Sequence, residues 1–253
     1  MLFRSVKNVS QNKEIRDKFI QAFSDAKYEL NIASPWMNNY VVNDKLIKTI
    51  STSEDAVKHA IKNYGDNDLQ NHISDALNSN KEFKALRGEV PSKTPKELSN
   101  YQKKYDRNDN KIKNEADKKI KEVGTTLANE QELFHGGKLI DTKENNKLTL
   151  SFPLSTTFDP VIANIEAIHN GKAYDEGELN ISIITNKNSK AKCFPFRHKG
   201  TSFGHEKEVL ISSGAELVVK EKKKISETTV YKHENGKDIK KVVPIYITKI
   251  DMS

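Results

Sequence analysis

Cysteine is nearly absent from the sequence, since Cys193 is the single one among 253 residues. A disulfide within the chain is therefore excluded, and so is a zinc site built from several cysteines. A lone cysteine is more often a small packing residue than a nucleophile, so we expect Cys193 to be structural. No apolar run approaches eighteen residues, and no transmembrane helix is expected.

Signals that would divide or export the chain are also missing. The first residues, MLFRSVKNVSQNKEIRDKF, lack the continuous apolar stretch of a secretory signal peptide. The sequence has no internal repeat, and no linker rich in Pro, Gly and Ser marks a domain boundary. We therefore expect one main domain over residues 51–253. Residues 1–50 are expected to form a helical extension, either separate from this domain or part of it.

Charge is what the sequence has in plenty: 42 Lys and Arg against 35 Asp and Glu give a net charge of +7. Such a charge suits contact with an anionic cofactor, a nucleic acid or an acidic membrane surface. The basic residues are spread along the chain rather than gathered in one block. We therefore predict no stable nucleic-acid or membrane partner.

The first part of the chain has mainly helical patterns. Apolar residues recur at helical spacing from Ile15, and Ser51 with Glu54 three residues on resembles a capping box. A second helix is expected over 69–77 and another from Thr94-Pro95, whose charged continuation to Gly124 predicts a solvated helix. Two short strands are expected among these helices, at YELNIAS (28–34) and EFKALRGEV (82–90).

From Glu132 onward the apolar period becomes that of strands. Asp159-Pro160 opens one intervening helix that ends near Gly171, and Asn235-Gly236 predicts a hairpin turn. Helices followed by antiparallel strands indicate an α+β domain rather than a doubly wound sheet. The expected strands are ELFHGGKLI, KLTLSFPL, ELNISIIT, EVLI, GAELVVKE, TTVYKHE and KVVPIYITKI.

Three short segments carry chemistry. Arg87-Gly88 ends a predicted strand, where an arginine fork can hold a diphosphate and glycine admits a ligand close to the backbone. The hydroxyls of Ser155-Thr156-Thr157 can bond a ribose, an amide or a carboxylate. Glu206 and Glu208 would share one face of a strand and divide the work of charge stabilisation and proton transfer. Taken singly, each segment also has an ordinary structural explanation.

In this order the three segments resemble the arginine-specific mono-ADP-ribosyltransferases, the arginine–serine–glutamate class of bacterial toxins and effectors. That family combines Arg-Gly after an apolar residue, then Ser-Thr-Ser, then Glu-x-Glu followed by Val-Leu. Here the motifs are Arg87-Gly88, Ser155-Thr156-Thr157 and Glu206-Lys207-Glu208-Val209-Leu210, within a resemblance that spans residues 55–250. Thr157 departs from the serine of the family pattern and keeps the hydroxyl.

The resemblance implies a fold and a substrate. The fold is an N-terminal helical lobe followed by a mixed, mainly antiparallel two-sheet core. The substrate is NAD, bound with no metal, and Arg87 with Gly88 would contact its diphosphate. Ser155, Thr156 and Thr157 would complete the NAD site, in which Ser155 positions the catalytic Glu208.

The resemblance also implies the roles of the remaining residues. Glu208 would bond the hydroxyls of the nicotinamide ribose and stabilise the cationic state as nicotinamide leaves. Glu206 would orient or deprotonate the acceptor, an exposed arginine of a target protein. Phe203, three positions before Glu206, would face that target. Proteins of this kind without a signal peptide resemble effectors injected into host cells, or phage enzymes acting inside bacteria, and we favour the injected effector.

Other assignments stay open at this stage. The long interval between Arg87 and Ser155 leaves room for Phe134-His135-Gly136-Gly137 as the first motif, as in the histidine–tyrosine–glutamate branch. We prefer Arg87, because the other two motifs belong to the arginine branch.

The same site in an NAD glycohydrolase would pass ADP-ribose to water. A catalytically dead binding module is less consistent with an intact Glu208. A nucleic-acid-binding or phosphodiesterase-like protein is a further alternative, whose His-x-Lys pair the sequence does not supply.

Overall fold

The fold is α+β, as the sequence predicts. The structure is a computed structural model, and it describes residues 29–30, 39–42, 45–50, 52–62, 64, 94–103, 109–140, 146–196 and 206–253. The described strands form a ten-stranded sheet of mixed, mainly antiparallel pairing and a separate two-stranded sheet. Within this described part, no helix is both long and apolar enough to cross a membrane.

The strands and helices follow the chain in a simple order. The strands are β1 (Glu29–Leu30), β2 (Asn39–Val42), β3 (Lys45–Thr49), β4 (Thr125–Leu127), β5 (Glu132–Gly136), β6 (Lys147–Thr149), β7 (Leu154–Thr157), β8 (Leu179–Asn186), β9 (Lys192–Pro195), β10 (Glu208–Ile211), β11 (Glu216–Glu234) and β12 (Lys237–Met252). The helices are α3 (Ser53–Lys62), α6 (Lys96–Lys103), α7 (Asn110–Val123), α8 (Pro160–Ile168), α9 (Lys172–Glu176) and a 3₁₀ turn at His169–Gly171.

The ten-stranded sheet has a weak seam between β5 and β7. The strand order is β1-β4-β9-β10-β7-β5-β8-β12-β11-β6, and the pairing of β5 with β7 consists of one residue pair, Phe134 with Thr157. By contrast, β5 pairs with β8 over its whole length. The resemblance implied two sheets. The structure corrects this to one sheet, because that single pair joins the two halves.

The described residues of the first fifty form strands, where the sequence predicts a helical extension. Within residues 1–50, the described elements are the strands β1, β2 and β3, and β1 falls in the expected strand over 28–34. Strand β1 pairs in parallel with β4, while β2 and β3 form the small sheet. The rest of 1–50, the expected helix over 69–77 and the expected strand over 82–90 lie outside the described residues.

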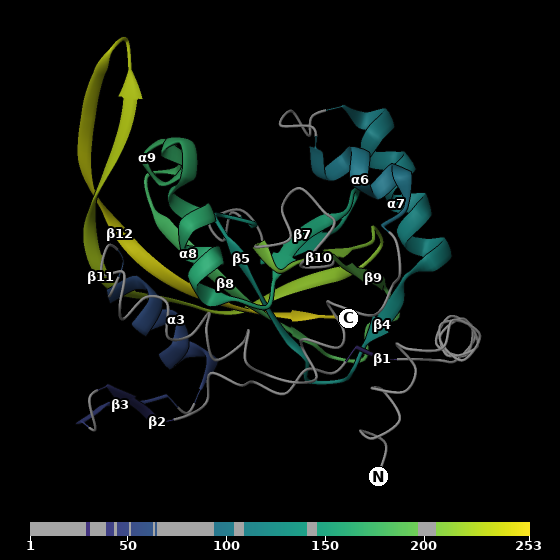
Figure 1. Ribbon diagram of the computed structural model, residues 1–253, viewed down its shortest axis with the longest axis horizontal. Coiled ribbons are helices and arrows are strands. Elements are labelled where there is room, and N and C mark those ends of the chain that lie inside the picture. Colours follow the sequence, from purple (N-terminus) through teal and green to yellow (C-terminus); the bar gives the residue numbers. More distant parts are fainter. Residues whose placement is uncertain are drawn as a thin grey trace.

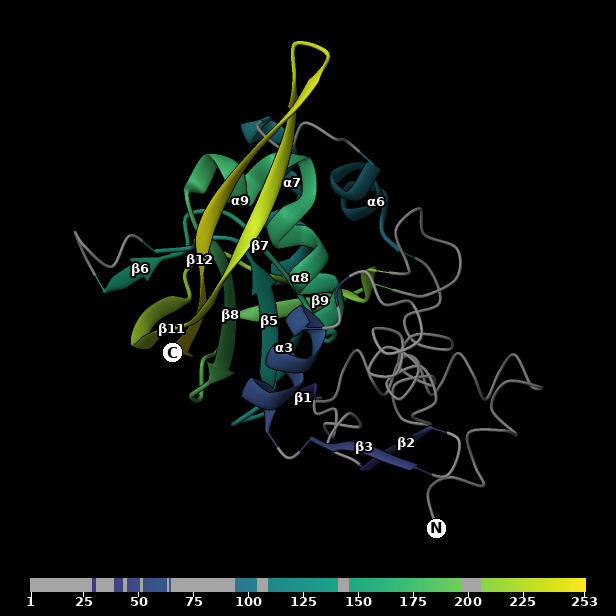
Figure 2. The same cartoon turned by 90° about the vertical axis from the view of Figure 1, so that its left-hand side faces the viewer.

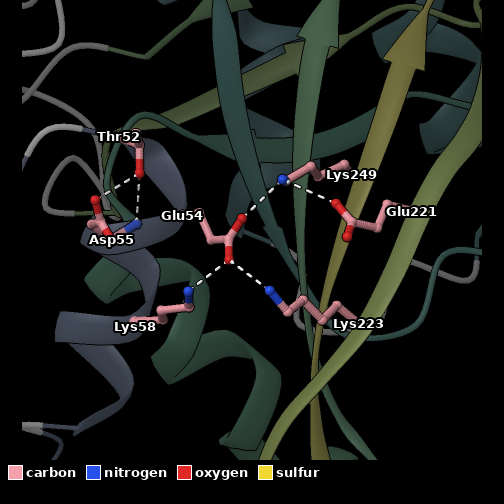
Figure 3. Close-up of polar contacts among 7 residues, drawn as sticks. All are labelled: Thr52, Glu54, Asp55, Lys58, Glu221, Lys223 and Lys249. Atoms are coloured by element: carbon pink, nitrogen blue, oxygen red, sulfur yellow. Dashed lines mark hydrogen bonds and ion pairs between the residues drawn. The ribbon is translucent and has the colours of Figure 1, made fainter.

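Helix α3 begins one residue later than its expected capping box. The Thr52 hydroxyl accepts from the Asp55 amide at 3.1 Å and donates to the Asp55 carboxylate at 2.9 Å. Thr52 is therefore the N-cap residue of α3, and Ser51, the expected cap, lies outside the described residues. This shift leaves the Glu54 carboxylate free of the cap, and Figure 3 shows it reaching lysines of the sheet and of α3.

Glu54 ties helix α3 to the long hairpin of β11 and β12. Its carboxylate lies 2.8 Å from the Lys249 ammonium, 2.6 Å from that of Lys58 and 3.8 Å from that of Lys223, while Lys249 also contacts Glu221 at 3.0 Å (Figure 3). The hydrogen bond from Lys249 and then that from Lys58 lower the Glu54 pKa to about 2. The ionised carboxylate therefore stabilises the folded chain.

Replacement of Glu54 by glutamine is expected to lower the free energy of unfolding by about 1–2 kcal/mol at pH 7, after allowance for half-exposed lysines. Because the folded pKa is depressed, this stability is present above pH 4.5 and is lost as the pH falls towards about 2. Urea denaturation from pH 3 to pH 7 measures the effect. Glu227→Gln, which removes an exposed pair with Lys224, is the control and is expected to change little. A Glu54→Gln effect of equal size at pH 3 and pH 7 would contradict the assignment.

Helices α6 and α7 are more than the solvated segment that the charge pattern predicts. Asp109 caps α7 by accepting from the Lys111 amide at 2.9 Å. One face of each helix is buried in a second core against strands β9 and β10. This face corrects the expectation of a fully solvated helix, because its apolar residues recur at four-residue spacing among the lysines. The core contains Leu98, Tyr101, Ile112, Ala116, Ile120, Phe194, Phe196 and Leu210.

The C-terminal hairpin extends far beyond the rest of the sheet (Figures 1 and 2). Strands β11 and β12 run as one pair, in place of the separate strands expected there, and Asn235-Gly236 form the predicted turn with φ of 52° and 77°. Helix α9 and the 3₁₀ turn before it lie against this hairpin (Figure 2). In the half of the hairpin nearer its turn, Lys232 binds Asp175 at 2.7 Å, and the Lys241 ammonium lies over the Tyr174 ring.

Candidate active site

A cleft of about 350 Å³ lies at the seam between β5 and β7. Its volume is within the range of small-molecule sites, about 300–1,000 Å³. The predicted Ser-Thr-Thr segment and both predicted glutamates line it, together with residues of α6, β5 and α8. The lining residues are Gln102, Phe134, His135, Gly136, Ser155, Thr156, Thr157, Ile162, Ala163, Glu166, His169, Asn170, Lys172, Glu206 and Glu208.

The three hydroxyls of β7 hold the segment that carries the glutamates. The Ser155 hydroxyl donates to Oε1 of Glu208 at 2.6 Å. The Thr156 hydroxyl donates to the Val209 carbonyl at 2.7 Å, and that of Thr157 to the Glu206 carbonyl at 2.8 Å. Because β7 and β10 pair side by side, the Ser-Thr-Thr motif fixes one carboxylate and the backbone around it.

Glu208 is almost fully buried, at 2% exposure, at the start of β10. Side chains alternate along a strand, so Glu208 shares the face of Leu210, which α6 and α7 cover. From α6, the Gln102 side-chain amide donates to Oε2 of Glu208 at 3.4 Å. Both oxygens of the carboxylate thus accept hydrogen bonds from uncharged donors.

Gln102 is a site residue that the sequence interpretation missed. It is 3% exposed and lies one turn after the fully buried Leu98. A polar residue at a core-facing position of a helix has to find a partner, since an unpaired buried amide is costly. That position was the available signal, but only the fold shows that its partner is Glu208, 106 residues further along the chain.

Glu206 lies in a turn and not on strand β10, which corrects the expectation that both glutamates share one strand face. Strand β10 begins at Glu208, and Lys207 has a positive φ of 50°. The two carboxylates nevertheless line the same cleft. Their shared direction therefore comes from a left-handed turn at Lys207 rather than from the two-residue period of a strand.

His135 lies on β5, and its side chain reaches across the seam to the backbone of Ser155 on β7. Its Nδ1 is 2.8 Å from the Ser155 carbonyl oxygen, which can only accept, so Nδ1 carries the proton. Burial, and then the nearby Lys172 ammonium, lower the His135 pKa to about 4, so the ring is neutral at pH 7. The neutral ring leaves Nε2 as a hydrogen-bond acceptor in the cleft.

The two glycines after His135 permit a close approach of α8 and Lys172. A Cβ on Gly136 would lie 2.0 Å from the Ala163 carbonyl oxygen, and one on Gly137 would lie 2.4 Å from the Lys172 ammonium. Gly137 also has a φ of +111°, which favours glycine. The Lys172 ammonium donates to the Gly136 carbonyl at 2.6 Å, which places a positive charge at the wall of the cleft.

Three of the expected site residues lie outside the described part of the chain: Arg87, Gly88 and Phe203. Cys193 is fully buried on β9, and burial raises its pKa to about 12, which confirms the packing role. Among the described residues, no group of three His, Cys, Asp or Glu side chains is arranged to hold a metal ion.

No family model matches the sequence, and no curated protein does. Solved structures do match. The Vis toxin, an ADP-ribosyltransferase from Vibrio splendidus, is 9% identical with a TM-score of 0.33, over 82% of this chain and 88% of that one. The chain is similar to bacterial ADP-ribosyltransferases.

Two further solved structures of bacterial proteins also match the chain. Plx2a, an ADP-ribosyltransferase toxin from Paenibacillus larvae, is 14% identical with a TM-score of 0.34, over 80% of this chain and 87% of that one. Exoenzyme S from Pseudomonas aeruginosa, solved with human 14-3-3 protein beta and bound to carba-NAD, is 15% identical with a TM-score of 0.34, over 77% and 73%. Since these TM-scores lie below 0.5, the function proposed below rests on the residues of the site.

Proposed function

We propose that this protein is a mono-ADP-ribosyltransferase that cleaves NAD, releases nicotinamide and transfers ADP-ribose to an arginine of a target protein. The observation that carries this proposal is Glu208, a buried carboxylate held by Ser155 in a cleft that it shares with Glu206. Two carboxylates facing one cleft suit a reaction in which one stabilises positive charge and the other moves a proton.

The chemistry assigns one role to each carboxylate. When the bond between the ribose carbon and the nicotinamide nitrogen breaks, its electron pair leaves with nicotinamide and positive charge develops on the ribose. Glu208 stabilises that charge, which exists only in the transition state. The guanidinium nitrogen of the acceptor then bonds to the ribose carbon and loses a proton to Glu206. Nicotinamide leaves as a neutral molecule, so no general acid is needed.

The described cleft offers groups that fit NAD. Nε2 of His135 can accept from a ribose hydroxyl or from the nicotinamide amide, since the ring is neutral and Nδ1 is the donor to Ser155. The Lys172 ammonium supplies a positive charge for the diphosphate. This geometry supports Phe134-His135-Gly136-Gly137 as the first motif, beside serine and glutamate motifs of the arginine branch. Contact of Arg87 and Gly88 with the diphosphate, and of Phe203 with the target, remains a prediction.

Replacement of His135 by alanine is expected to raise the KM for NAD about tenfold, because one hydrogen bond to the substrate is lost. The kcat is expected to change less, since the bond forms in the ground state as well. Initial rates of nicotinamide release at several NAD concentrations measure both constants. His233→Ala, at an exposed histidine of the hairpin, is the matched control. A fall in kcat with unchanged KM would place His135 in the chemical step.

The proposed function is tested by incubating the purified protein with labelled NAD and lysates of eukaryotic and bacterial cells. Labelling of a discrete protein that Glu208→Ala abolishes, and that neutral hydroxylamine removes, supports transfer to arginine. Release of nicotinamide that depends on Glu208, with no labelled protein, indicates an NAD glycohydrolase. If the protein neither binds nor cleaves NAD, the proposal is wrong. Labelling in eukaryotic lysate alone supports an effector injected into host cells.

A further inference from the structure

Lys207, the residue between the two glutamates, is buried rather than solvated. Its side chain is 5% exposed and its ammonium contacts Oδ2 of Asp159, whose side chain is fully buried. Lysine and aspartate are seldom buried unless they are paired. The middle position of a charged Glu-Lys-Glu run therefore points into the protein, while both neighbours line the cleft.

The backbone at Lys207 is held in a conformation that lysine rarely adopts. Its φ of 50° is in the left-handed region, which costs a residue other than glycine about 1 kcal/mol or more. Such conformations persist where the surroundings impose them, and they gather at functional sites. Here the turn lets Glu206 and Glu208 face one cleft although Glu206 is not on the strand.

Asp159 links this turn to the rest of the site. Its Oδ1 accepts from the Val161 amide at 2.9 Å and so caps α8, a helix that lines the cleft. Its own amide donates to the Thr157 hydroxyl at 3.0 Å, and that hydroxyl donates to the Glu206 carbonyl. The path from Lys207 through Asp159 and Thr157 returns to Glu206, which closes a ring of polar contacts around the turn.

We propose that Lys207 is a positioning residue whose ion pair with Asp159 locks the left-handed turn and so directs both carboxylates into the same cleft, Glu208 towards the ribose of NAD and Glu206 towards the acceptor. The proposal rests on the proposed function. A buried ion pair is weak evidence for stability, because desolvation offsets most of its attraction, and replacing both partners by neutral residues is often harmless to the fold. The position of this pair between the two glutamates instead favours a role in geometry.

The test uses the double variant Lys207→Met with Asp159→Asn. Asparagine still caps a helix, and no uncompensated buried charge is left. We expect the kcat of nicotinamide release to fall about 30- to 100-fold, since small misplacements of reacting groups have effects of that order. The KM for NAD is expected to stay within about twofold, because His135 and Lys172 are untouched. The melting temperature is expected to stay within about 5 °C, since the paired replacement leaves stability nearly unchanged.

The matched control removes another largely buried ion pair, that of Lys222 with Glu178 at 2.7 Å, through Lys222→Met with Glu178→Gln. Neither residue lines the cleft, and kcat should be unchanged. A Lys207/Asp159 variant with wild-type kcat overturns the positioning role while leaving the proposed function intact.

Amide hydrogen exchange at residues 206–209 gives a readout that needs no activity. Faster exchange at these amides in the double variant, with the rest of the sheet unchanged, supports the lock even in a wild-type protein that does not cleave NAD. Unchanged exchange in these residues overturns it. Failure of the proposed function, seen as an inactive wild type, is thus separated from failure of the lock.

Discussion

The Glu208→Gln protein is expected to bind NAD with nearly unchanged affinity and to release nicotinamide about 10³-fold more slowly than wild type. Glutamine keeps the volume of this buried side chain and can bond Ser155 and Gln102, so the fold should survive. It lacks the negative charge that stabilises the cationic ribose in the transition state. Calorimetric titration with NAD gives the affinity, and single-turnover release of nicotinamide gives the rate.

Ser155→Ala is the control for this prediction. It leaves the Glu208 charge in place and removes one hydrogen bond from Oε1, so a loss of about tenfold is expected. A Glu208→Gln rate within tenfold of wild type would show that the carboxylate does not carry the chemical step. Equal losses in the two variants would instead indicate that Ser155 acts through more than the orientation of Glu208.

The parts of the site that the sequence predicts are those with local chemical signals. Ser155, Thr156 and Thr157 are adjacent hydroxyls at the end of a strand, and Glu208 opens a run of apolar strand residues. Their side-by-side placement then follows from the antiparallel pairing of β7 with β10. In the same way, the helix opened by Asp159-Pro160 and the Asn235-Gly236 turn were predicted, because capping and turn chemistry act within a few residues.

The parts that the sequence did not predict depend on contacts between distant segments. Gln102 reaches Glu208 because α6 packs on the face of β10 that carries Glu208 and Leu210. No local sequence pattern indicates which strand a helix will cover. Lys207 is one lysine among many by composition, and its burial depends on Asp159, 48 residues earlier. The assumption that two-residue spacing implies one strand face failed at Glu206, because the strand begins two residues later than that assumption requires.

The seam between β5 and β7 explains why the cleft lies where it does. Strands that pair along their whole length leave no room between them, whereas here one residue pair joins the two halves of the sheet. The contact from His135 to the Ser155 carbonyl bridges the same seam by a side chain. Polar side chains at the ends of β5 and β7 thus face a shared opening, with α8 as its wall.

The Glu206→Gln protein is expected to separate the two halves of the proposed reaction. Transfer of ADP-ribose to an arginine-containing peptide should fall about 10²-fold, because the acceptor nitrogen loses the base that takes its proton. Hydrolysis of NAD should stay within about threefold of wild type, since Glu208 and its contact with Ser155 are unchanged. Parallel assays of labelled peptide and of released nicotinamide measure the two rates.

Each outcome of the Glu206→Gln comparison assigns the carboxylate. Loss of transfer with retained hydrolysis supports Glu206 as the base that takes the acceptor's proton. The turn at Lys207, which directs Glu206 into the cleft, would then serve transfer to arginine rather than hydrolysis. Equal loss of both rates would place Glu206 in the cleavage of NAD itself. Retention of both rates would leave Glu208 as the one catalytic carboxylate and would contradict the assignment of Glu206 as the base that takes the acceptor's proton.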